Sequence, residues 1–425
     1  MSKEWNPPMK PLQNGRLHLG PAQATLLLLI ALNLLNYIDR YILSGEVEPI
    51  QREFHATDHQ MGALATALFV FYMIAAPLTG WLGDRFRRKP LIIAGATLWS
   101  LATLGTVWVH SYWTFYLRQG LVGIGEATFG IFAPAVIADF YPERERNRIL
   151  STFYVAIPVG AALGYLAGGQ LGSLFGWRAP FLICALPGFA VAALYGLFGR
   201  EPERGACDHL RSTHSRSTFR GLFRNPAYLA ATFGLALLTF AMGGMSWWMP
   251  EFLRRASGLS MSSASLVVGA TTVVDGIAGT LVGGWLAQRW LARDHRALYL
   301  LSFWSVLLTF ACGLVVFFGP HGCTIPALFA AEFFLFLNTG PLNTAIINSV
   351  AAPIRATAVG LNFFIIHCFG DTFSPQIIGA VSDATGSLRL AMGTTLLAML
   401  ASAAILRVGV RVAPPLEEPA KPISA

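Results

Sequence analysis

The sequence predicts an all-α membrane protein in which twelve transmembrane helices form two pseudo-symmetric six-helix halves, and three observations support this. Of the 425 residues, 54% are hydrophobic and only 12% are charged, whereas soluble domains carry roughly 25% charged residues. The apolar residues are gathered into runs of about 20, the length that a helix needs to cross the hydrocarbon core of a bilayer. One long polar segment divides these runs into two sets of six.

The apolar runs define the expected helices. The first run is too long for the apolar region of a signal peptide, and no small-residue cleavage site follows it, so we expect it to remain as helix 1. The spans are expected near residues 22–44, 60–82, 90–109, 113–139, 149–173, 179–199, 226–249, 262–287, 297–318, 325–350, 358–382 and 390–408.

The basic residues predict the orientation. An even number of spans puts both termini on one side of the membrane, and a cytosolic N-terminus places most of the 30 Lys and Arg residues in cytosolic segments. This is the distribution that the positive-inside rule favours. The net charge of +8 therefore requires no nucleic-acid partner, and anionic lipid of the inner leaflet is the expected counter-surface. We expect a multi-pass protein of the inner or plasma membrane, with both termini cytosolic.

The chain is expected to divide into an N-terminal half (1–199), a cytosolic central loop (200–225) and a C-terminal half (226–425). Internal repetition supports this division. GWLGDR, residues 80–85, ends the second span of the first half, and GWLAQR, residues 284–289, ends the second span of the other. Tandem halves with a site between them are typical of transporters.

Several segments resemble a known family. GWLGDRFRRK, residues 80–89, resembles the cytosolic loop signature of the major facilitator superfamily, although Arg87 stands where a glycine is usual. Residues 158–178 resemble helix 5 of that superfamily. NYIDR, GLVGIGEA, IPVGAALG and HCFGDTFSPQIIGAVSD, beginning at residues 36, 120, 157 and 367, resemble its spinster branch. The resemblance implies a transporter of lipids or lysolipids.

Eight ionisable side chains fall within the expected spans. Each must be paired or hydrated to be tolerated there, so each is a candidate functional group. They are Asp39, Arg40, Arg118, Glu126, Asp275, Glu332, His367 and Asp371.

The polar wall of helix 1 is the first candidate site. Asn36, Tyr37 and Arg40 share one helical face, because they are three and four residues apart. We expect Arg40 to face a central cavity and to bind an anionic substrate, with Asp39 nearby reducing the cost of that charge. A purely structural ion pair between helices 1 and 4 is the alternative.

Helix 4 supplies the second candidate site. Glu126 lies near the middle of this span, where burial favours the protonated carboxyl and makes it a candidate proton carrier. A protonated acid bonded to a backbone carbonyl is the structural alternative. Arg118 is expected to hold the ionised Glu126 or a substrate phosphate, because guanidinium is a permanently charged planar fork. Phe129 is expected beside the substrate's tail, with core packing as its alternative.

Helix 11 carries a candidate titrating pair. His367 and Asp371 are four residues apart and can meet on one helical face. They are expected to take part in proton coupling with Glu126 and Asp39, although a structural hydrogen bond fits equally. Asp275 and Glu332 rank lower, because a hydrated cavity wall or an interhelical bond would explain them.

Charged residues at the cytosolic helix ends predict a gate. In the superfamily the loop after helix 2 resembles a latch that holds the outward-facing state, and the cluster DFYPERERNR, residues 139–148, would join it. Positive-inside topology explains some of the same bases. The expected gating residues are Asp84, Arg85, Arg88, Lys89, Asp139 and Arg146.

These features favour a secondary active transporter that works by alternating access and is coupled to protons, with sodium as the other candidate ion. No phosphate-binding loop supports nucleotide-driven pumping, and no Cys/His cluster predicts a metal or other cofactor. The expected substrate is a lysophospholipid or related anionic single-chain amphiphile, and the alternative is a soluble organic anion or drug-like compound. A function as a lipid-modifying enzyme, a channel or a receptor is a remote alternative. The expected partners are substrate, protons and membrane lipids, and the expected state is a monomer.

Overall fold

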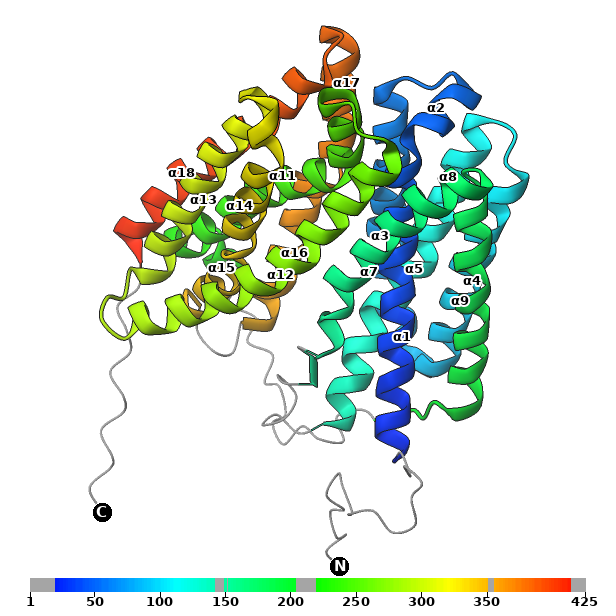
Figure 1. Cartoon of the computed structure of the whole chain (residues 1–425). Helices are drawn as coiled ribbons and strands as arrows, with labels where there is room; N and C mark the ends of the chain where they lie inside the picture. The colour runs from blue at the N-terminus through cyan, green and yellow to red at the C-terminus, as the bar shows by residue number, and fades with distance from the viewer. Residues whose placement is uncertain (1–19, 142–148, 151, 204–218, 351–354, 414–425) are drawn as a thin grey trace, which may run out of the picture.

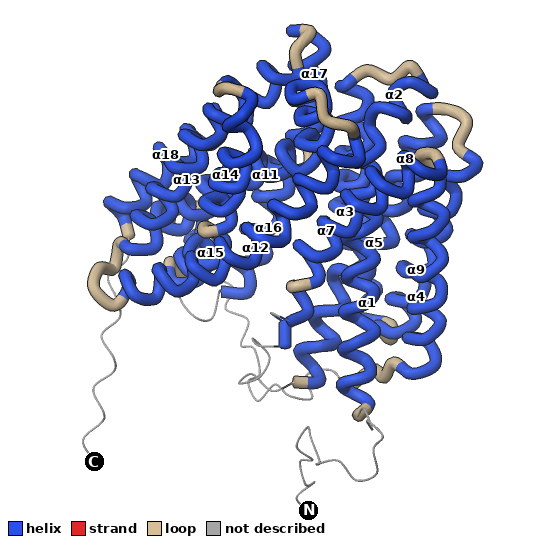
Figure 2. The backbone as a smooth tube through the Cα atoms, in the orientation of Figure 1, coloured by secondary structure: helices blue, strands red, loops and turns tan. Residues whose placement is uncertain are grey.

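The computed structural model describes residues 20–141, 149–150, 152–203, 219–350 and 355–413. The described residues form helices joined by short turns, without a strand (Figure 2). Within the described part of the chain, eleven helices are long and apolar enough to cross a membrane. A further, interrupted helical segment occupies the position expected for span 11, so the predicted twelve-helix architecture is confirmed.

The N-terminal half contains spans 1 to 6. Span 1 continues beyond its expected end at residue 44, because a 3-10 turn and a short amphipathic helix extend it to Phe54. The elements are α1 (Pro21–Ile42), η1 (Leu43–Glu46), α2 (Val47–Phe54), α3 (Asp58–Arg85), α4 (Arg88–Gly105), η2 (Thr106–Trp108), α5 (Tyr112–Phe140), α7 (Ala156–Leu166), η3 (Ala167–Leu171), α8 (Gly172–Phe175) and α9 (Ala179–Phe198).

The C-terminal half contains spans 7 to 12, and two of them are broken within the membrane-spanning region. The elements are α11 (Pro226–Ser257), α12 (Met261–Leu291), α13 (Ala297–Phe318), η4 (His321–Cys323), α14 (Thr324–Phe336), α15 (Thr339–Asn348), α16 (Arg355–Ile366), η6 (His367–Asp371), α17 (Ser374–Thr385) and α18 (Leu388–Val412), preceded by the short α10 (Phe219–Leu222).

Spans 5 and 11, which occupy equivalent places in the two halves, share a π-helical turn. The turn is η3 in span 5 and η6 in span 11. In η6 the backbone leaves helical geometry at Gly370, with φ −104° and ψ −107°. Such turns widen the helix locally and are frequent at functional sites. This shared irregularity supports the pseudo-symmetry indicated by the GWLGDR and GWLAQR repeat.

The two bundles lean together at the end remote from the chain termini and diverge toward the termini (Figure 1). At the remote end α17 packs on α3, and α12 packs on α7. Glycines permit backbone contact there: a Cβ on Gly62 would lie within 2.6 Å of Pro375 and Gln376, and one on Gly379 would overlap Asp58. The described polar contacts between the halves reach inward along α3 only as far as Met73.

The arrangement makes the predicted orientation testable with single-cysteine variants. Cys207 lies outside the described residues, in the central loop. Cys323 is exposed and follows span 9, on the side that the predicted orientation places outside the cell. An impermeant maleimide added to sealed cells should label Cys323 at once and Cys207 only after permeabilisation. Labelling of Cys207 in sealed cells would contradict cytosolic termini.

Candidate functional site

An ion pair between α1 and α5 forms the centre of the candidate site. The Nε of Arg40 lies 2.6 Å from Oε2 of Glu126. The Glu126 side chain is fully buried, whereas the Arg40 side chain is 17% exposed. The arginine can therefore reach a ligand that the acid cannot.

Aromatic rings enclose the Arg40 guanidinium. Its Cζ lies 5.0, 5.6 and 5.7 Å from the ring centroids of Tyr37, Phe69 and Tyr72. Each contact is in the range of a cation–π interaction, which stabilises a desolvated cation. Two of these rings come from α3, so three helices of the N-terminal half hold this side chain.

Among the described residues, three buried polar atoms near the pair make no well-formed hydrogen bond. They are Glu126 Oε1, Asn36 Nδ2 and Asp39 Oδ1, although the Asn36 amide lies close enough to interact with the Glu126 carboxylate. The other carboxylate oxygen of Asp39 accepts a bond of 3.1 Å from Thr103 of α4. Unsatisfied groups of this kind are costly in a core, and they mark the pair as a site with spare hydrogen-bonding capacity.

A second polar pair approaches from the C-terminal half. His367 Nδ1 lies 2.9 Å from Oδ1 of Asp371, so the predicted meeting of these side chains on one helical face is confirmed. The His367 ring stacks on Phe69 of α3, with centroids 6.3 Å apart and an interplanar angle of 19°. Phe69 therefore contacts both Arg40 and His367, and it links the polar groups of the two halves.

Arg118 and Phe129 make their direct contacts elsewhere in the N-terminal half, although Arg118 lies within electrostatic range of Asp39 and Glu126. Arg118 is buried and donates from Nε to the carbonyl of Ala102 at 2.9 Å. Phe129 packs between Trp99 and Phe153 in the core. The Arg40 guanidinium forms the direct ion pair with Glu126, which is the pair between helices 1 and 4 that the sequence left as an alternative. The role expected of Arg118 stays a prediction.

The expected gating residues at the terminal side make contacts within the N-terminal half. Arg88 Nη1 bonds Asp139 Oδ2 at 2.6 Å, and Glu201 accepts from the backbone N–H groups of Arg88 and Lys89 at the start of α4. Arg85 lies over Trp81, 4.0 Å from the ring centroid. Arg146 and the Asp84 side chain lie outside the described part of the structure.

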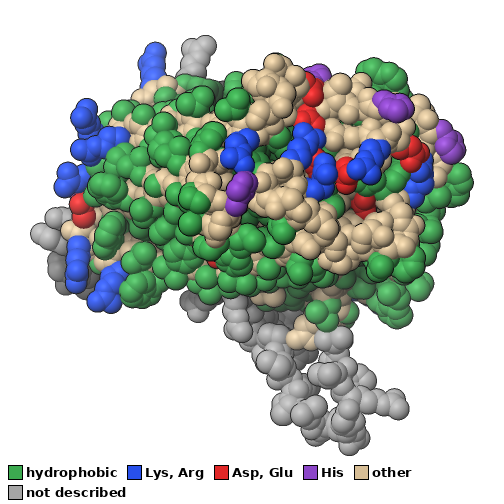
Figure 3. All heavy atoms as spheres, turned by 45° about the horizontal axis from the view of Figure 1, so that its top comes forward, with side chains coloured by type: hydrophobic (Ala, Val, Ile, Leu, Met, Phe, Trp, Pro, Cys, Tyr) green, Lys and Arg blue, Asp and Glu red, His purple; other side chains and the backbone are tan. Residues whose placement is uncertain are grey.

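A charged network that the sequence analysis missed joins the halves at the remote face (Figure 3). The Arg255 guanidinium of α11 bonds both carboxylate oxygens of Asp58 at 2.6 and 2.7 Å. Asp383 of α17 accepts from the backbone N–H groups of Asp58 and His59, at 2.9 and 2.8 Å, and so caps α3 from the other half. The fully buried Glu251 side chain bonds Arg255 as well. Three helices from two halves thereby meet at Asp58.

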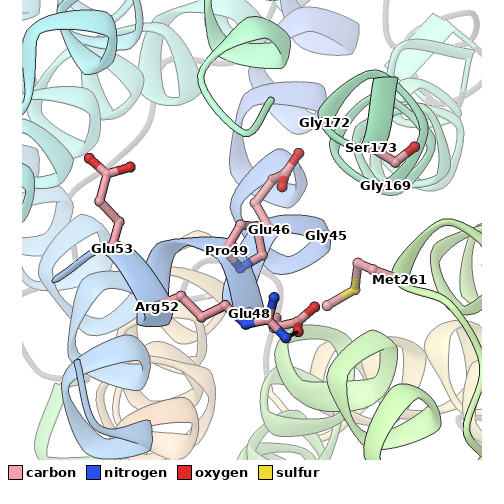
Figure 4. A pocket seen from close by; sticks show the side chains of 10 residues that line it. All are labelled: Gly45, Glu46, Glu48, Pro49, Arg52, Glu53, Gly169, Gly172, Ser173 and Met261. Carbon is pink, nitrogen blue, oxygen red and sulfur yellow. Dashed lines mark ion pairs between the residues drawn. The ribbon is translucent and has the colours of Figure 1, made fainter. Parts of the chain in front are cut away.

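A pocket of about 480 Å³ opens at the seam of this face (Figure 4). The Glu46 side chain points toward Gly172, where a Cβ would overlap it, and away from Glu48 and Arg52. Glu46 is 2% exposed, and its Oε1 has no partner. The pocket begins five residues after Arg40 along span 1, at Gly45, and belongs to the closed seam.

Comparison with known proteins identifies the family. The profile of the Major Facilitator Superfamily matches residues 29–375. The chain belongs to this superfamily. Human "Protein spinster homolog 1" is 33% identical over 397 residues, which cover 86% of this chain and 74% of the relative. The "Sphingosine-1-phosphate transporter SPNS2" of Xenopus tropicalis is 33% identical over 369 residues, which cover 83% and 72%.

A solved structure confirms the fold of this spinster-type transporter. The crystal structure of a bacterial homolog of the human lysosomal transporter spinster, in an inward-facing and unoccupied conformation, superposes with a TM-score of 0.83 at 23% identity. The match covers 92% of this chain and 98% of that one. The predicted resemblance, the twelve-helix fold and the assignment as a multi-pass transporter, and not an enzyme, are thereby confirmed.

The Arg255–Asp58 contact should control how readily the remote face opens. Because charged hydrogen bonds contribute about 1.5–3 kcal/mol each, Arg255→Ala should raise the population of molecules open at this face by roughly tenfold or more. Distances between spin labels on α3 and α17 report this directly. Arg178→Ala is a matched control, because Arg178 pairs with Glu53 inside the N-terminal half. Identical distance distributions in the parent and Arg255→Ala would rule out this role.

Proposed function

We propose that this spinster-type transporter moves a lysophospholipid or a related anionic single-chain amphiphile by alternating access, coupled to protons. The observation that carries the proposal is the Arg40–Glu126 pair, in which a buried acid and a partly exposed base meet inside the membrane. A relative named for sphingosine-1-phosphate transport supports a substrate with one chain and an anionic head.

Arg40 is the substrate anchor in this proposal. A guanidinium stays charged and presents a planar fork that suits phosphate. Its exposed part and the rings of Tyr37, Phe69 and Tyr72 provide one charged contact and an apolar surround. An amphiphile's head and the first part of its tail require that combination.

Glu126 is the proton carrier. When the substrate's anion draws Arg40 away, Glu126 remains as a buried carboxylate without a counter-charge, which is strongly unfavourable. Proton uptake removes that cost. Substrate and proton are thereby bound together, and Asp39, whose second oxygen has no partner, adjusts the local charge.

His367 and Asp371 extend the proton-coupling site into the C-terminal half. The pair lies against Phe69, and Tyr37 lies within electrostatic range of Asp371. Closure of the terminal side would bring the two halves together around these groups. With cytosolic termini, the state in Figure 1 is the inward-facing one. Arg85 and Arg88 would then exchange their present contacts with Trp81 and Asp139 for the proposed latch, which Lys89 would join when that side closes.

A soluble organic anion or drug-like compound is the second candidate substrate. The observation that favours it is the ring of aromatic side chains around Arg40, which would also hold an aromatic anion. A binding screen that compares lysolipids with soluble aromatic anions separates the two classes.

Substitution of Glu126 and substitution of Arg40 should impair different steps of transport. Glu126→Gln should keep substrate binding but remove proton-driven accumulation, because the amide cannot exchange a proton. Arg40→Ala should weaken binding of the anionic substrate by at least about tenfold even without a gradient, since a charged hydrogen bond contributes about 1.5–3 kcal/mol. Arg40→Lys should restore binding only in part, because ammonium lacks the fork.

The measurement is paired: binding of labelled lysophospholipid in detergent, and uptake into proteoliposomes with and without an imposed pH gradient. Glu203→Gln, an exposed acid-to-amide change, is the control. Undiminished gradient-driven accumulation by Glu126→Gln would refute the carrier role. Undiminished binding by Arg40→Ala would refute the anchor.

A further inference from the structure

The C-terminal half contains two buried acids that the proposed mechanism does not use. Asp275 of α12 is 5% exposed, and Glu332 of α14 is 8% exposed. They lie within electrostatic range of each other. Neither takes part in an ion pair among the described residues, in contrast to Glu126, which has Arg40. This part of the half therefore holds acidic groups without a matching base.

The atoms around these acids are oxygen donors. The hydroxyl groups of Thr271 and Thr272 lie within hydrogen-bond reach of the Glu332 carboxyl. Thr271 also donates to the carbonyl of Val268 at 2.9 Å, which leaves the lone pairs of its oxygen available. Asp275 Oδ2 and Glu332 Oε2 are buried and have no hydrogen-bond partner. Two carboxylate oxygens thus lack a proton donor or cation.

An interrupted helix adds further negative potential. Span 10 breaks one turn after Glu332, between the end of α14 at Phe336 and the start of α15 at Thr339. The last carbonyls of a helix carry partial negative charge. The carbonyl of Leu337, at the break, lies against Gly283 of α12, where a Cβ would overlap it, whereas the carbonyl of Phe333 accepts from the Leu337 N–H at 3.1 Å. Broken membrane helices of this type coordinate cations in transporters.

Of the side chains that the structure describes around these acids, none provides a compensating positive charge. Tyr165 of α7 lies within electrostatic range of Glu332, but its phenol is neutral and donates to the carbonyl of Ser246. Two neighbouring carboxyls share one proton more readily than they both ionise, which leaves a single negative charge. A monovalent cation matches that charge, and an all-oxygen donor set suits a hard ion.

We propose that Asp275, Glu332, Thr271 and Thr272 form a binding site for one sodium ion between α12 and α14. The site lies in the C-terminal half and is separate from the Arg40–Glu126 pair. It does not rest on the proposed substrate or on proton coupling through Glu126. Because α12 also packs on α7 across the seam, sodium binding would stiffen a helix of the C-terminal half that contacts the N-terminal half.

The direct test is equilibrium binding of ²²Na⁺ to the purified full chain at fixed pH, with choline chloride keeping the ionic strength constant. The parent should bind sodium saturably, at about one ion per chain. Glu332→Gln and Asp275→Asn should each weaken binding by at least about tenfold, because each removes a carboxylate ligand. Thr271→Val, which keeps the side-chain shape, should weaken it less. Glu126→Gln should bind as the parent does.

Thermal unfolding is the second readout, because a ligand that binds only the folded state raises the melting temperature. Sodium should raise it in the parent and in Glu126→Gln, and not in Glu332→Gln or Asp275→Asn. Without sodium, these two variants should melt at or above the parent's temperature, since an unpaired buried charge has been removed.

Several outcomes would overturn the site. They are absence of saturable sodium binding in the parent, unchanged binding in both carboxyl variants, displacement of sodium by equimolar Mg²⁺ or Ca²⁺, or a response to pH without a response to sodium. Loss of sodium binding in Glu126→Gln alone would assign the ion to the other site.

Discussion

The Arg40–Glu126 ion pair is the constraint on which the rest of this structure depends. A charged group inside the membrane must be paired or hydrated. Arg40 and Glu126 remain paired only while α1 and α5 keep their present separation, and Arg40 is hydrated only while its side chain stays partly exposed. Gly160 and Gly164 of α7 allow close packing against α1, at Leu34 and Ile38. Glycine positions therefore determine where Arg40 lies as much as its own helix does.

The two faces of the molecule differ in whether their charged contacts join the two halves or stay within one half. At the remote face Arg255, Asp58 and Asp383 join the halves, so separation of this face exposes or breaks charged contacts. At the terminal face the Arg88–Asp139 pair stays inside one half. In the proposed alternating access, closure of one face at the expense of the other would exchange such contacts.

The fold was largely predictable from the sequence, because hydropathy, span length and the GWLGDR repeat are local signals. The His367–Asp371 contact was also predictable, since its geometry follows from the helical repeat. An ion pair between helices 1 and 4 was open as an alternative, but the sequence could not choose it, because Glu126 is 86 residues away from Arg40 and pairing between helices depends on their rotation. The same rotation directs Phe129 into the core. Arg255 and Glu46 were overlooked because they lie beyond the expected span ends, where charges are ordinary.

The central claim is that the substrate's anion and Glu126 compete for Arg40, so that substrate binding and proton binding are linked. The most direct measurement is proton uptake by the purified transporter in weakly buffered nanodiscs, followed with a pH indicator as lysophospholipid is added. The account predicts uptake that saturates with the substrate, approaches about one proton per transporter at a pH where Glu126 starts ionised, and disappears in Glu126→Gln although substrate still binds. Saturable binding without proton uptake in the parent at every pH tested, or equal uptake in Glu126→Gln, would contradict it.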